Sequence, residues 1–444
     1  MLNNIITQKK PIKILLVTQN PICTYSNIGK TLNALFDIFD KKELCQLYTY
    51  PALPDIHKCN SYYQLSDLDI LKACFRKKKG KILLDSDINS NNSMFESKNS
   101  QKAYQIGIKK GPLKIIMRDA MWSFCGWKSS NLYDWIEKEK PTHIFVLPGR
   151  FKFISKIALQ LSKDFNLPLI TYICDDFYFV KQSKSFWGII NGYCYKRQMD
   201  ILLKKTSYCL TISEELSLAF KEKLSIDPMT VMTGTNYSIK ASPSDFDSVD
   251  CVNYFGNINC GRYKSLYILG IILDQINSEY NLNIAFNIYT SESNKEAKNL
   301  FGKTKSIVIK SFVKGKEFES LFFNSKILVH VESFDPKDVD YVKHSVSTKI
   351  ADSLASGIVL CAFGPENVSS ILHLQRNGYP MVALSQEELY RKLKQVLFDK
   401  KYRIECATKG LEIAQKFHNS KKTSAAIRNY IINSPNQKNG GKHF

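Results

Sequence analysis

The chain has 444 residues, 44% hydrophobic and 23% charged, with 62 Lys and Arg against 41 Asp and Glu for a net charge of +21. This composition excludes disorder on a large scale, and the length suits two domains of about 200 residues each. The positive charge points to polyanionic partners, namely nucleic acid, anionic lipid or phosphorylated small molecules, unless it only reflects the abundance of Lys throughout the chain.

Cysteine spacing and hydropathy exclude two further classes. The twelve cysteines are scattered singly, without a Cys-x-x-Cys pair or a Cys/His cluster, so no zinc or redox motif is supported. Lys9, Lys10 and Lys13 interrupt any signal-like stretch, and no run of about 18 apolar residues occurs. We therefore expect a protein of a reducing, cytoplasmic compartment.

The first half of the chain alternates between expected strands and helices. Residues 12–18 form a β-branched run that predicts a buried strand, and the next loop carries Gly29 and leads into a helical pattern from Leu32. Strands at 143–147, 167–173 and 209–212 and a helix at 154–161 follow, and Ser213 is placed to cap the next helix. This order is typical of a doubly wound α/β domain.

A polar, turn-rich stretch then separates a second series of the same kind. The expected strands are 252–255, 283–289, 307–309, 326–331 and 359–362, and the helices are 266–276, 317–323 and 348–354. We predict an N-terminal domain (1–236), a linker (237–249), a C-terminal domain (250–432), a disordered tail (433–444) and a mobile low-complexity loop (84–102). Both sheets would present their binding loops to the cleft between the domains.

Two strand–loop–helix motifs in the second series suggest anion binding. In the first, Gly256 and Asn257 precede a helix that begins near Arg262, which can make a forked contact to a diphosphate, with Lys264 as a second cation. A plain turn with a solvated basic pair explains these residues equally well. In the second, Ser347, Thr348 and Lys349 open a helix whose first amides face an anion, and Asp352, one turn later, can bind ribose hydroxyls.

Taken together, the two motifs resemble a known family. Gly-Asn followed by Arg, then Ser-x-Ser-Thr-Lys-Ile-x-acid-x-Leu-Ala-x-Gly and Gly-Pro, are similar to the retaining nucleotide-sugar glycosyltransferases of bacterial capsule, O-antigen and exopolysaccharide assembly. The resemblance covers the segments 12–35, 135–177, 209–214 and 254–365 in order. It implies an α/β fold of the GT-B kind, with two Rossmann-like doubly wound domains facing across a cleft and the donor bound by the C-terminal one.

The resemblance also implies roles for single residues. Arg262 and the amides around Ser347 and Thr348 would bind the donor diphosphate, and Asp352 would be the second acid of the family's Glu-x7-Glu pair. The position of the first acid is occupied by His344. Either the histidine serves in its place, or the chain is an inactive homologue, or a nearby acid substitutes: Glu332, Asp335, Asp338 or Asp340.

Three residues of the first half complete the candidate site. Asp175 and Asp176 follow a strand, so both point toward the cleft and are candidates for orienting the acceptor, although Asp176 equally suits a helix N-cap. Gly29 would lie beside the donor phosphates or the acceptor, or would serve only a tight turn.

The expected partners follow from the resemblance and from the charge. They are a nucleotide-sugar donor, with a UDP-sugar favoured and a GDP-sugar possible, and a saccharide or polyprenyl-diphosphate-linked acceptor. The resemblance implies no bound cofactor or metal, because Arg and helix dipoles neutralise the leaving diphosphate in such folds. No metal signature accompanies the donor motif, since Asp338-Val339-Asp340 matches one by its letters but precedes the wrong element. Basic-aromatic stretches at 75–81 and 109–127 suit the anionic inner face of the cell membrane, or are simply a solvated charge run beside an amphipathic helix.

Two alternatives to an active transferase stay open. A nucleic-acid-binding protein fits the charge, but no helix-turn-helix, zinc-finger or aromatic RNA-binding signature occurs, so we expect no nucleic-acid partner. A catalytically inactive GT-B scaffold fits His344 at the position of the expected acid.

Overall fold

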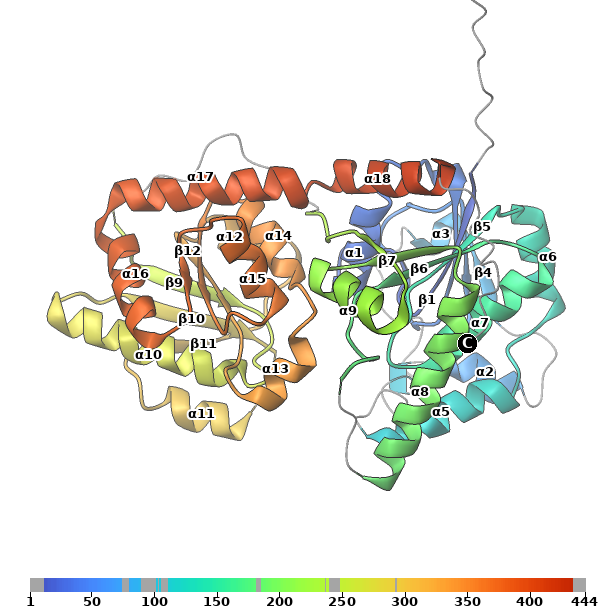
Figure 1. Ribbon diagram of the computed structural model, residues 1–444, viewed down its shortest axis with the longest axis horizontal. Helices are drawn as coiled ribbons and strands as arrows, with labels where there is room; N and C mark the ends of the chain where they lie inside the picture. The colour runs from blue at the N-terminus through green and yellow to red at the C-terminus, as the bar shows by residue number, and fades with distance from the viewer. Residues whose placement is uncertain are drawn as a thin grey trace, which may run out of the picture.

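The computed structural model describes residues 12–73, 80–88, 101–102, 104, 111–180, 185–235, 237–238, 248–291 and 294–433. Within these ranges the chain forms two lobes that lie side by side, each built on one largely parallel sheet with helices packed around it (Figure 1). The predicted α/β class with two doubly wound domains is therefore confirmed.

The N-terminal lobe has a sheet of strand order β4-β3-β2-β1-β5-β6-β7-β8, in which β4 pairs antiparallel and the other described pairs are parallel. Its elements are β1 (Ile14–Thr18), α1 (Asn27–Leu35), η1 (Lys41–Glu43), β2 (Leu44–Tyr48), β3 (Ser61–Gln64), α2 (Asp67–Ala73), β4 (Lys81–Leu83), α3 (Asp85–Ile88), α5 (Pro112–Phe124), α6 (Ser130–Glu139), β5 (His143–Val146), α7 (Lys152–Asp164), β6 (Leu169–Ile173), α8 (Phe186–Lys205), β7 (Tyr208–Thr211), α9 (Glu214–Leu224) and β8 (Met229–Thr230).

Burial explains which of these strands the sequence predicts. Every residue of β1 and β6 is buried, as expected for parallel strands covered on both faces, and their continuous apolar runs stand out in the sequence. The strand β2 is also fully buried, but it contains Gln46 and was not predicted. The Gln46 amide donates to the Thr18 hydroxyl at 2.8 Å and accepts from Ile22 N–H at 3.0 Å, so this buried side chain fixes the loop that follows β1.

The C-terminal lobe has a sheet of strand order β11-β10-β9-β12-β13-β14, with parallel pairing throughout its described strands. Its elements are β9 (Cys251–Phe255), α10 (Arg262–Glu279), β10 (Ala285–Thr290), α11 (Lys295–Phe301), β11 (Ile307–Ser311), α12 (Gly315–Phe323), β12 (Ile327–Val331), α13 (Pro336–Val342), α14 (Thr348–Ala355), β13 (Val359–Phe363), α15 (Ser369–Arg376), β14 (Val382–Ala383), α16 (Gln386–Phe398) and α17 (Lys400–Phe417). Each strand and helix predicted in this half is present.

The chain crosses between the lobes twice, and the two crossings lie against each other. Thr235 N–H donates to the His418 carbonyl at 2.8 Å, and the His418 ring donates from Nδ1 to the Thr233 carbonyl at 2.9 Å. A Cβ atom on Gly234 would lie 2.7 Å from Ser420 Cα, so the close approach requires glycine. The connection between the lobes is therefore a paired, hydrogen-bonded strap.

The last described helix, α18 (Ser420–Asn433), returns to the N-terminal lobe, where it continues the line of α17 across the top of the molecule (Figure 1). Ile427 and Ile431 belong to the N-terminal core, and the Arg428 guanidinium is forked onto the Glu43 carboxylate. The predicted C-terminal range, 250–432, includes this helix by chain position, but its contacts are with the other lobe.

Several sequence predictions fall wholly or partly outside the described residues. They are the basic run at 75–81, the low-complexity loop at 84–102, the start of the basic-aromatic stretch at 109–127, the linker at 237–249 and the tail at 433–444. Of the helices that the structure describes, none has the length and apolar character needed to cross a bilayer.

Candidate active site

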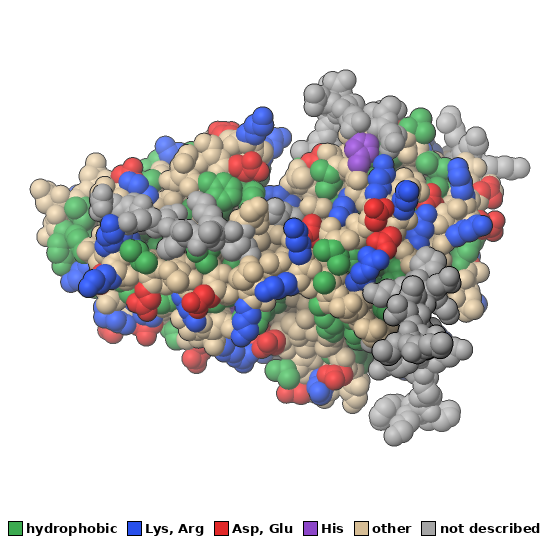
Figure 2. All heavy atoms as spheres, turned by 90° about the horizontal axis from the view of Figure 1, so that it is seen from above, with side chains coloured by type: hydrophobic (Ala, Val, Ile, Leu, Met, Phe, Trp, Pro, Cys, Tyr) green, Lys and Arg blue, Asp and Glu red, His purple; other side chains and the backbone are tan. Residues whose placement is uncertain are grey.

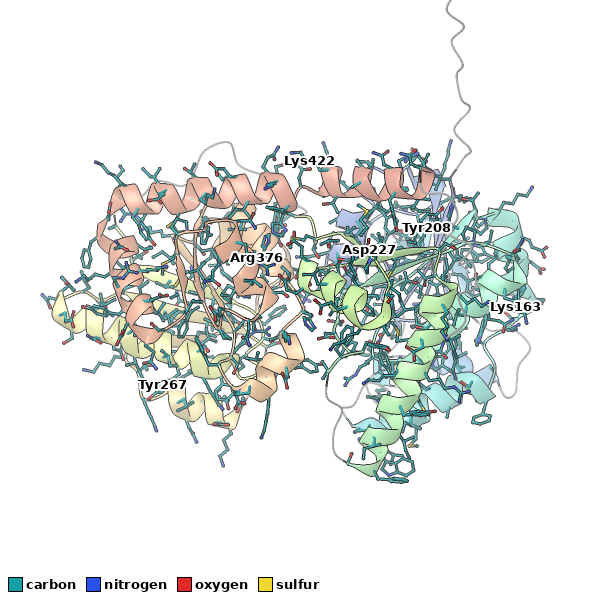
Figure 3. All side chains as sticks on the ribbon, in the orientation of Figure 1. Lys163, Tyr208, Asp227, Tyr267, Arg376 and Lys422 are labelled. Carbon is teal, nitrogen blue, oxygen red and sulfur yellow. The ribbon has the colours of Figure 1, made fainter. Side chains whose placement is uncertain are left out.

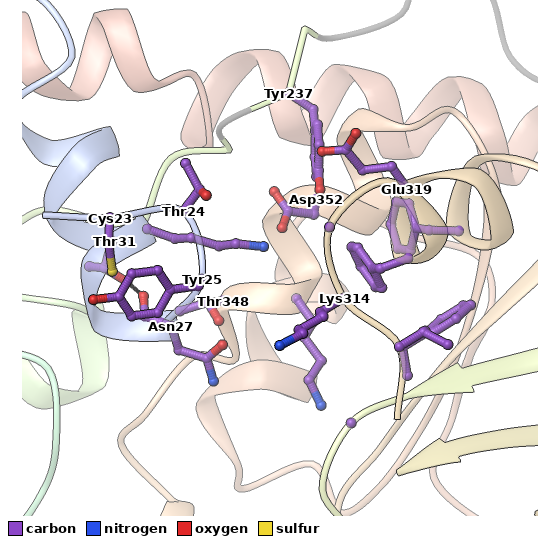
Figure 4. A pocket seen from close by; sticks show the side chains of 18 of the residues that line it. Cys23, Thr24, Tyr25, Asn27, Thr31, Tyr237, Lys314, Glu319, Thr348 and Asp352 are labelled. Carbon is purple, nitrogen blue, oxygen red and sulfur yellow. Dashed lines mark hydrogen bonds between the residues drawn. The ribbon is translucent and has the colours of Figure 1, made fainter. Parts of the chain in front are cut away.

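A pocket of about 930 Å³ lies between the two lobes (Figure 4). The N-terminal lobe lines it with the β1–α1 loop and the first turns of α1, and the first crossing contributes Thr233, Gly234 and Tyr237. The C-terminal lobe lines it with the β9–α10 and β11–α12 loops and the start of α14. This interdomain pocket is thus built from loops at the carboxyl edges of both sheets, where ligands bind in open α/β sheets.

Gly29 allows the N-terminal wall of the pocket to form. The Ser26 hydroxyl caps α1 by accepting from Gly29 N–H at 3.0 Å. A Cβ atom at Gly29 would lie 2.2 Å from Cys23 Sγ, so the loop can pack directly on the start of the helix. Gly29 does not itself line the pocket, whereas its neighbours Asn27 and Lys30 do.

Gly256 and Lys349 meet in the opposite wall. Gly256 has a φ of +155°, and a Cβ atom there would lie 1.7 Å from Lys349 Nζ. The Lys349 ammonium also lies 5.2 Å from the centre of the Tyr254 ring. The lysine therefore reaches from the first turn of α14 across the bare backbone after β9, and both residues line the pocket together with Asn257.

Asp352 lies one turn further along α14 and faces the first crossing. Its carboxylate accepts from the Thr235 hydroxyl at 2.8 Å. Figure 4 shows it on the same side of the pocket as Tyr237 and Glu319. Burial raises the pKa of the Tyr237 phenol, and the negative charges of Asp352 and Glu319 raise it further. This corner of the pocket is accordingly acidic and suited to hydroxyl donors.

An aromatic wall closes the C-terminal side. The Phe255 and Tyr289 rings stack with centroids 4.6 Å apart, and Phe318 and Phe322 pack beside them. The Lys30 ammonium of the N-terminal lobe lies 5.5 Å from the Phe318 ring centre, so it reaches across the pocket. These aromatic residues were not predicted, because they come from three separate elements and look like ordinary core positions in the sequence.

Arg262 lies beside the pocket but does not line it. Its guanidinium is forked onto Glu332, with Nε to Oε2 at 3.0 Å and Nη2 to Oε1 at 3.2 Å, and its Nη1 donates to the Asn257 side chain at 3.0 Å. Burial acts to raise the pKa of the Glu332 carboxyl, but Arg262 and His330 hold it below its ordinary value. Both members of the pair are charged, and together they fix the β9–α10 loop.

The acids that were alternatives to His344 lie away from the pocket lining. Glu332 is fully engaged by Arg262, Asp335 caps α13 and pairs with Lys264 at 3.5 Å, and Asp338 accepts from the Ser333 hydroxyl at 3.1 Å. Asp340 lies on α13, on the exposed side of that short helix.

His344 and Asp176, predicted from opposite halves of the chain, are in direct contact. The His344 Nδ1 atom is hydrogen-bonded to Asp176 Oδ2, and both side chains are buried. The Ser213 hydroxyl donates to the His344 carbonyl at 2.5 Å, and the Ser345 hydroxyl donates to the Cys174 carbonyl at 3.5 Å. The segment before α14 is thus docked on the carboxyl edge of the N-terminal sheet.

Asp175 and Ser347 do not line the interdomain pocket. Burial raises the pKa of the Asp175 carboxyl, against smaller opposing effects of Cys174 and Arg150. Ser347 occupies the N-cap position of α14, but its side chain makes no capping bond and its N–H donates to the Ser370 hydroxyl at 3.0 Å.

The predicted site residues therefore form three groups. One set lines the interdomain pocket: Gly256, Asn257, Thr348, Lys349 and Asp352. Gly29, Arg262 and Ser347 adjoin residues of the lining without lining the pocket themselves, and Lys264 pairs with Asp335 outside the lining. The third, Asp175, Asp176 and His344, lies at the second junction of the lobes.

No protein-family model matches the chain, and no curated protein sequence matches it. Solved structures do match in fold. HepE of Anabaena, in complex with UDP, superposes with a TM-score of 0.59 at 11% identity over 95% of this chain and 99% of that one. The sucrose-phosphate synthase of Thermosynechococcus elongatus gives 0.58 at 11% over 95% and 98%, and the trehalose-6-phosphate synthase OtsA gives 0.56 at 10% over 94% and 98%.

These similarities extend over nearly the whole of each chain, so they include both lobes and their mutual arrangement. The fold is GT-B, with two Rossmann-like domains facing across a cleft. At 10–11% identity the comparison establishes the fold alone.

Proposed function

We propose that the chain is a glycosyltransferase that moves a sugar from a nucleotide-sugar donor to a saccharide or lipid-linked saccharide acceptor in cell-surface polysaccharide assembly. The observation that carries the proposal is the interdomain pocket, in which Lys349 and the start of α14 face the Gly256 backbone, with Asp352 one turn away. Cations and a helix N-terminus beside a glycine loop suit a diphosphate, and a carboxylate at that distance suits a ribose.

The aromatic wall supplies the rest of the donor site. Phe255, Tyr289 and Phe318 offer an apolar surface on which a nucleobase can pack. A UDP-sugar is the favoured donor, because HepE was crystallised with UDP and UDP-glucose and OtsA-type trehalose-6-phosphate synthase with UDP-2-fluoro glucose. The role in capsule or O-antigen assembly, and retention of configuration, rest on the motif resemblance.

Lys349 is the proposed direct contact of the donor diphosphate, with Arg262 behind it. A direct contact of Arg262 would require its fork on Glu332 to open. Arg262 instead holds Asn257, and so orders the loop that lies against the diphosphate. In catalysis Lys349 and the dipole of α14 would stabilise the leaving nucleoside diphosphate, which removes the need for a resident metal.

The test is binding of UDP-, GDP-, ADP- and CMP-sugars by thermal shift and calorimetry. One class of nucleotide should stabilise the wild type, and Lys349→Met should weaken its binding about 10- to 100-fold, the loss expected for one charge-assisted contact. Lys303→Met, at an exposed lysine after α11, is the matched control and should bind like the wild type. Equal binding by wild type and Lys349→Met, or no binding of any nucleotide, contradicts the proposal.

Turnover distinguishes an active enzyme from an inactive scaffold with the same pocket. Release of the nucleoside diphosphate from the bound donor, in the presence of an extract of cellular glycans, should occur for the wild type and stop in Asp352→Asn. Donor binding without any release would identify a scaffold.

The alternative of a nucleic-acid-binding protein has less support. Figure 2 shows Lys and Arg side chains spread over the face seen from above, with Asp and Glu among them rather than in a continuous basic groove. Salt-sensitive binding of DNA or RNA in the absence of nucleotide-sugar binding would favour it.

We further propose that the protein docks on an anionic membrane through a face formed by α5 and α8. The large apolar side chains exposed on these two packed helices are Leu113, Met117, Phe124, Phe186, Trp187, Ile189, Tyr193 and Ile201, with Phe124 89% exposed. A hollow beside them is lined by Trp122 and Trp127 and by four lysines, Lys128, Lys156, Lys163 and Lys205. Apolar groups flanked by lysines suit the head-group layer of an anionic bilayer.

Co-sedimentation with vesicles tests this docking face. The wild type should bind vesicles rich in phosphatidylglycerol and not pure phosphatidylcholine, and replacement of Phe124 and Trp187 by Ser should abolish the binding. Ile271→Ser, at a residue similarly exposed on the other lobe, is the control. Retention of binding by the Phe124/Trp187 variant would show that another surface is used.

A further inference from the structure

Arg150 lies at the edge of the N-terminal sheet that faces the C-terminal lobe. It follows β5, and Asp175 follows the neighbouring parallel strand β6, with Val146 of β5 opposite Thr171 of β6. Because neighbouring parallel strands end at the same edge, the two side chains occupy adjacent loops. The contact of Asp176 with His344 shows that this edge meets the other lobe.

The Arg150 guanidinium has no ion-pair or hydrogen-bond partner among the described residues, and its Nε atom is buried without one. Three other arginines with buried guanidinium groups each have a protein partner, although two Nη atoms of Arg118 are themselves without a hydrogen bond in the described part of the chain. Arg118 pairs with Asp67 at 3.0 Å, Arg262 with Glu332 at 3.0 Å, and Arg403 donates to the Val396 carbonyl at 3.1 Å. A half-buried guanidinium without a protein partner lowers the stability of the fold. An arginine of this kind therefore points to a ligand that binds it.

Among the residues that the structure describes, no carboxylate forms an ion pair with Arg150. Burial raises the pKa of the neighbouring Asp175 carboxyl despite the opposing guanidinium, which is the behaviour of two groups that are near but not paired. Burial also raises the pKa of Tyr341 on α13, and Arg150 again acts against it. Tyr341 of the C-terminal lobe packs edge-on against Phe177 of the N-terminal lobe, with ring centroids 6.3 Å apart, so Arg150 lies near this contact between the lobes.

We propose that Arg150 binds an anionic group of the acceptor, so that the acceptor is a saccharide carrying a phosphate or a carboxylate. This inference rests on the proposed glycosyltransferase function and names the class of its second substrate. The planar fork of an arginine matches both anions in a two-pronged contact. Arg150 is not among the residues that line the interdomain pocket, where Lys30, Lys314 and Lys349 already supply positive charge for the donor.

The experiment measures binding of small probes to the UDP-saturated protein by calorimetry, with glucose 6-phosphate, glucuronic acid and neutral glucose as ligands. The wild type should bind at least one anionic sugar ten-fold or more tightly than glucose, and the phosphate and carboxylate probes distinguish the two kinds of acceptor. Arg150→Gln should lose that preference, and Arg150→Lys should retain part of it. Arg391→Gln, at an exposed arginine of α16, is the matched control and should behave as the wild type does.

A second measurement keeps the test independent of folding. Because Arg150→Gln removes an unpaired charge, its melting temperature without ligand should be equal to or higher than that of the wild type, and its UDP affinity should be unchanged. Equal binding of anionic and neutral sugars by the wild type, or an unchanged preference in Arg150→Gln, would overturn the inference. Failure of UDP to bind the wild type would contradict the proposed donor site instead. If anionic sugars were still preferred in an Arg150-dependent way, the anion site at Arg150 would be supported independently of the donor site.

Discussion

Two histidines at the crossing between the lobes make the stability of the protein depend on pH, and the sequence alone does not indicate this. His373 of α15 and His418 at the end of α17 are hydrogen-bonded through their Nε2 atoms at 3.1 Å. Since the Thr233 carbonyl can only accept, His418 donates from Nδ1 and its Nε2 must accept from His373. The His418 ring must therefore be neutral. The His373 Nδ1 atom lies 3.4 Å from the Asn377 amide nitrogen, which can only donate, so His373 is neutral as well.

We predict that acid destabilises the protein through this pair. Burial lowers the pKa of His373 to about 3 and that of His418 to about 4, below the ordinary value of 6.5. Stability from each ring is complete above pH 6.5 and is lost as the pH falls toward these values, by about 2 kcal/mol for each histidine at pH 5. Urea unfolding at pH 7.5 and pH 5 should show this loss for the wild type and a smaller one for His418→Asn, with His57→Asn as the control. An equal loss in His418→Asn would show that other groups titrate.

A second residue-scale prediction concerns Gly256. Gly256→Ala should cost about 1 kcal/mol of stability, because φ there is +155°, and should also displace Lys349 and so weaken nucleotide binding. Gly378→Ala is the matched control, since Gly378 also has a positive φ (+68°) but the nearest atom to its Cβ would be Lys409 Cε at 3.6 Å. It should cost similar stability and leave nucleotide affinity unchanged. Unchanged nucleotide affinity in Gly256→Ala would show that this loop is not part of the donor site.

At the scale of elements, α18 is the least expected feature. It follows α17 after a break at His418 and Asn419, and it belongs to the opposite lobe from the sheet that precedes it. The Tyr208 hydroxyl donates to the Ile431 carbonyl at 3.3 Å, and Ser420 donates to Asp37 at 2.8 Å. The helix therefore completes the N-terminal core after the C-terminal lobe has been synthesised.

We predict that Ile427→Ala destabilises the N-terminal lobe by about 2–4 kcal/mol, as expected for truncation of a fully buried isoleucine. Hydrogen exchange should then rise in β7 and α1, far away in sequence, and stay constant in β9–β14. Lys421→Ala, on the exposed side of the same helix, is the control. Exchange that rises in the C-terminal sheet instead would contradict this assignment of α18.

At the scale of the whole molecule, a few contacts hold the lobes near each other. Besides the two crossings, these include the His344–Asp176 bond and the ion pair between Arg376 of α15 and Glu215 of α9, at 2.6 Å. Figure 3 shows Arg376 on the side of its lobe that faces α9. The exposed ion pair contributes at most about 1 kcal/mol and weakens with salt, so the buried bond is the stronger restraint.

Opening of the lobes should follow from loss of these contacts. We predict that Asp176→Asn combined with Arg376→Gln gives a larger radius of gyration in small-angle scattering, and that a bound nucleotide sugar reverses part of the change. Arg391→Gln, which alters a charge of similar exposure far from the junction, should scatter like the wild type. An unchanged radius in the double variant would show that the crossings alone set the arrangement.

The sequence by itself determined the fold class and most of the second sheet. The strands β1, β6, β12 and β13 are buried along their whole length and are mostly apolar, because parallel strands are covered on both faces. That pattern can be read without knowledge of distant contacts. It also indicated Gly256, Lys349 and Asp352, because glycine loops and helix starts are local features.

Only the tertiary structure decided how those residues are used. Arg262 pairs with Glu332 and His344 with Asp176, and each pair joins separate elements of the chain. Arg150 has no partner among the described residues. Whether a cation is neutralised or left for a ligand depends on burial and on neighbours brought in by folding, and local sequence carries neither. The position of α18 could not be predicted for the same reason. Its amphipathic pattern indicates that it packs on a core, but not which of the two cores it completes.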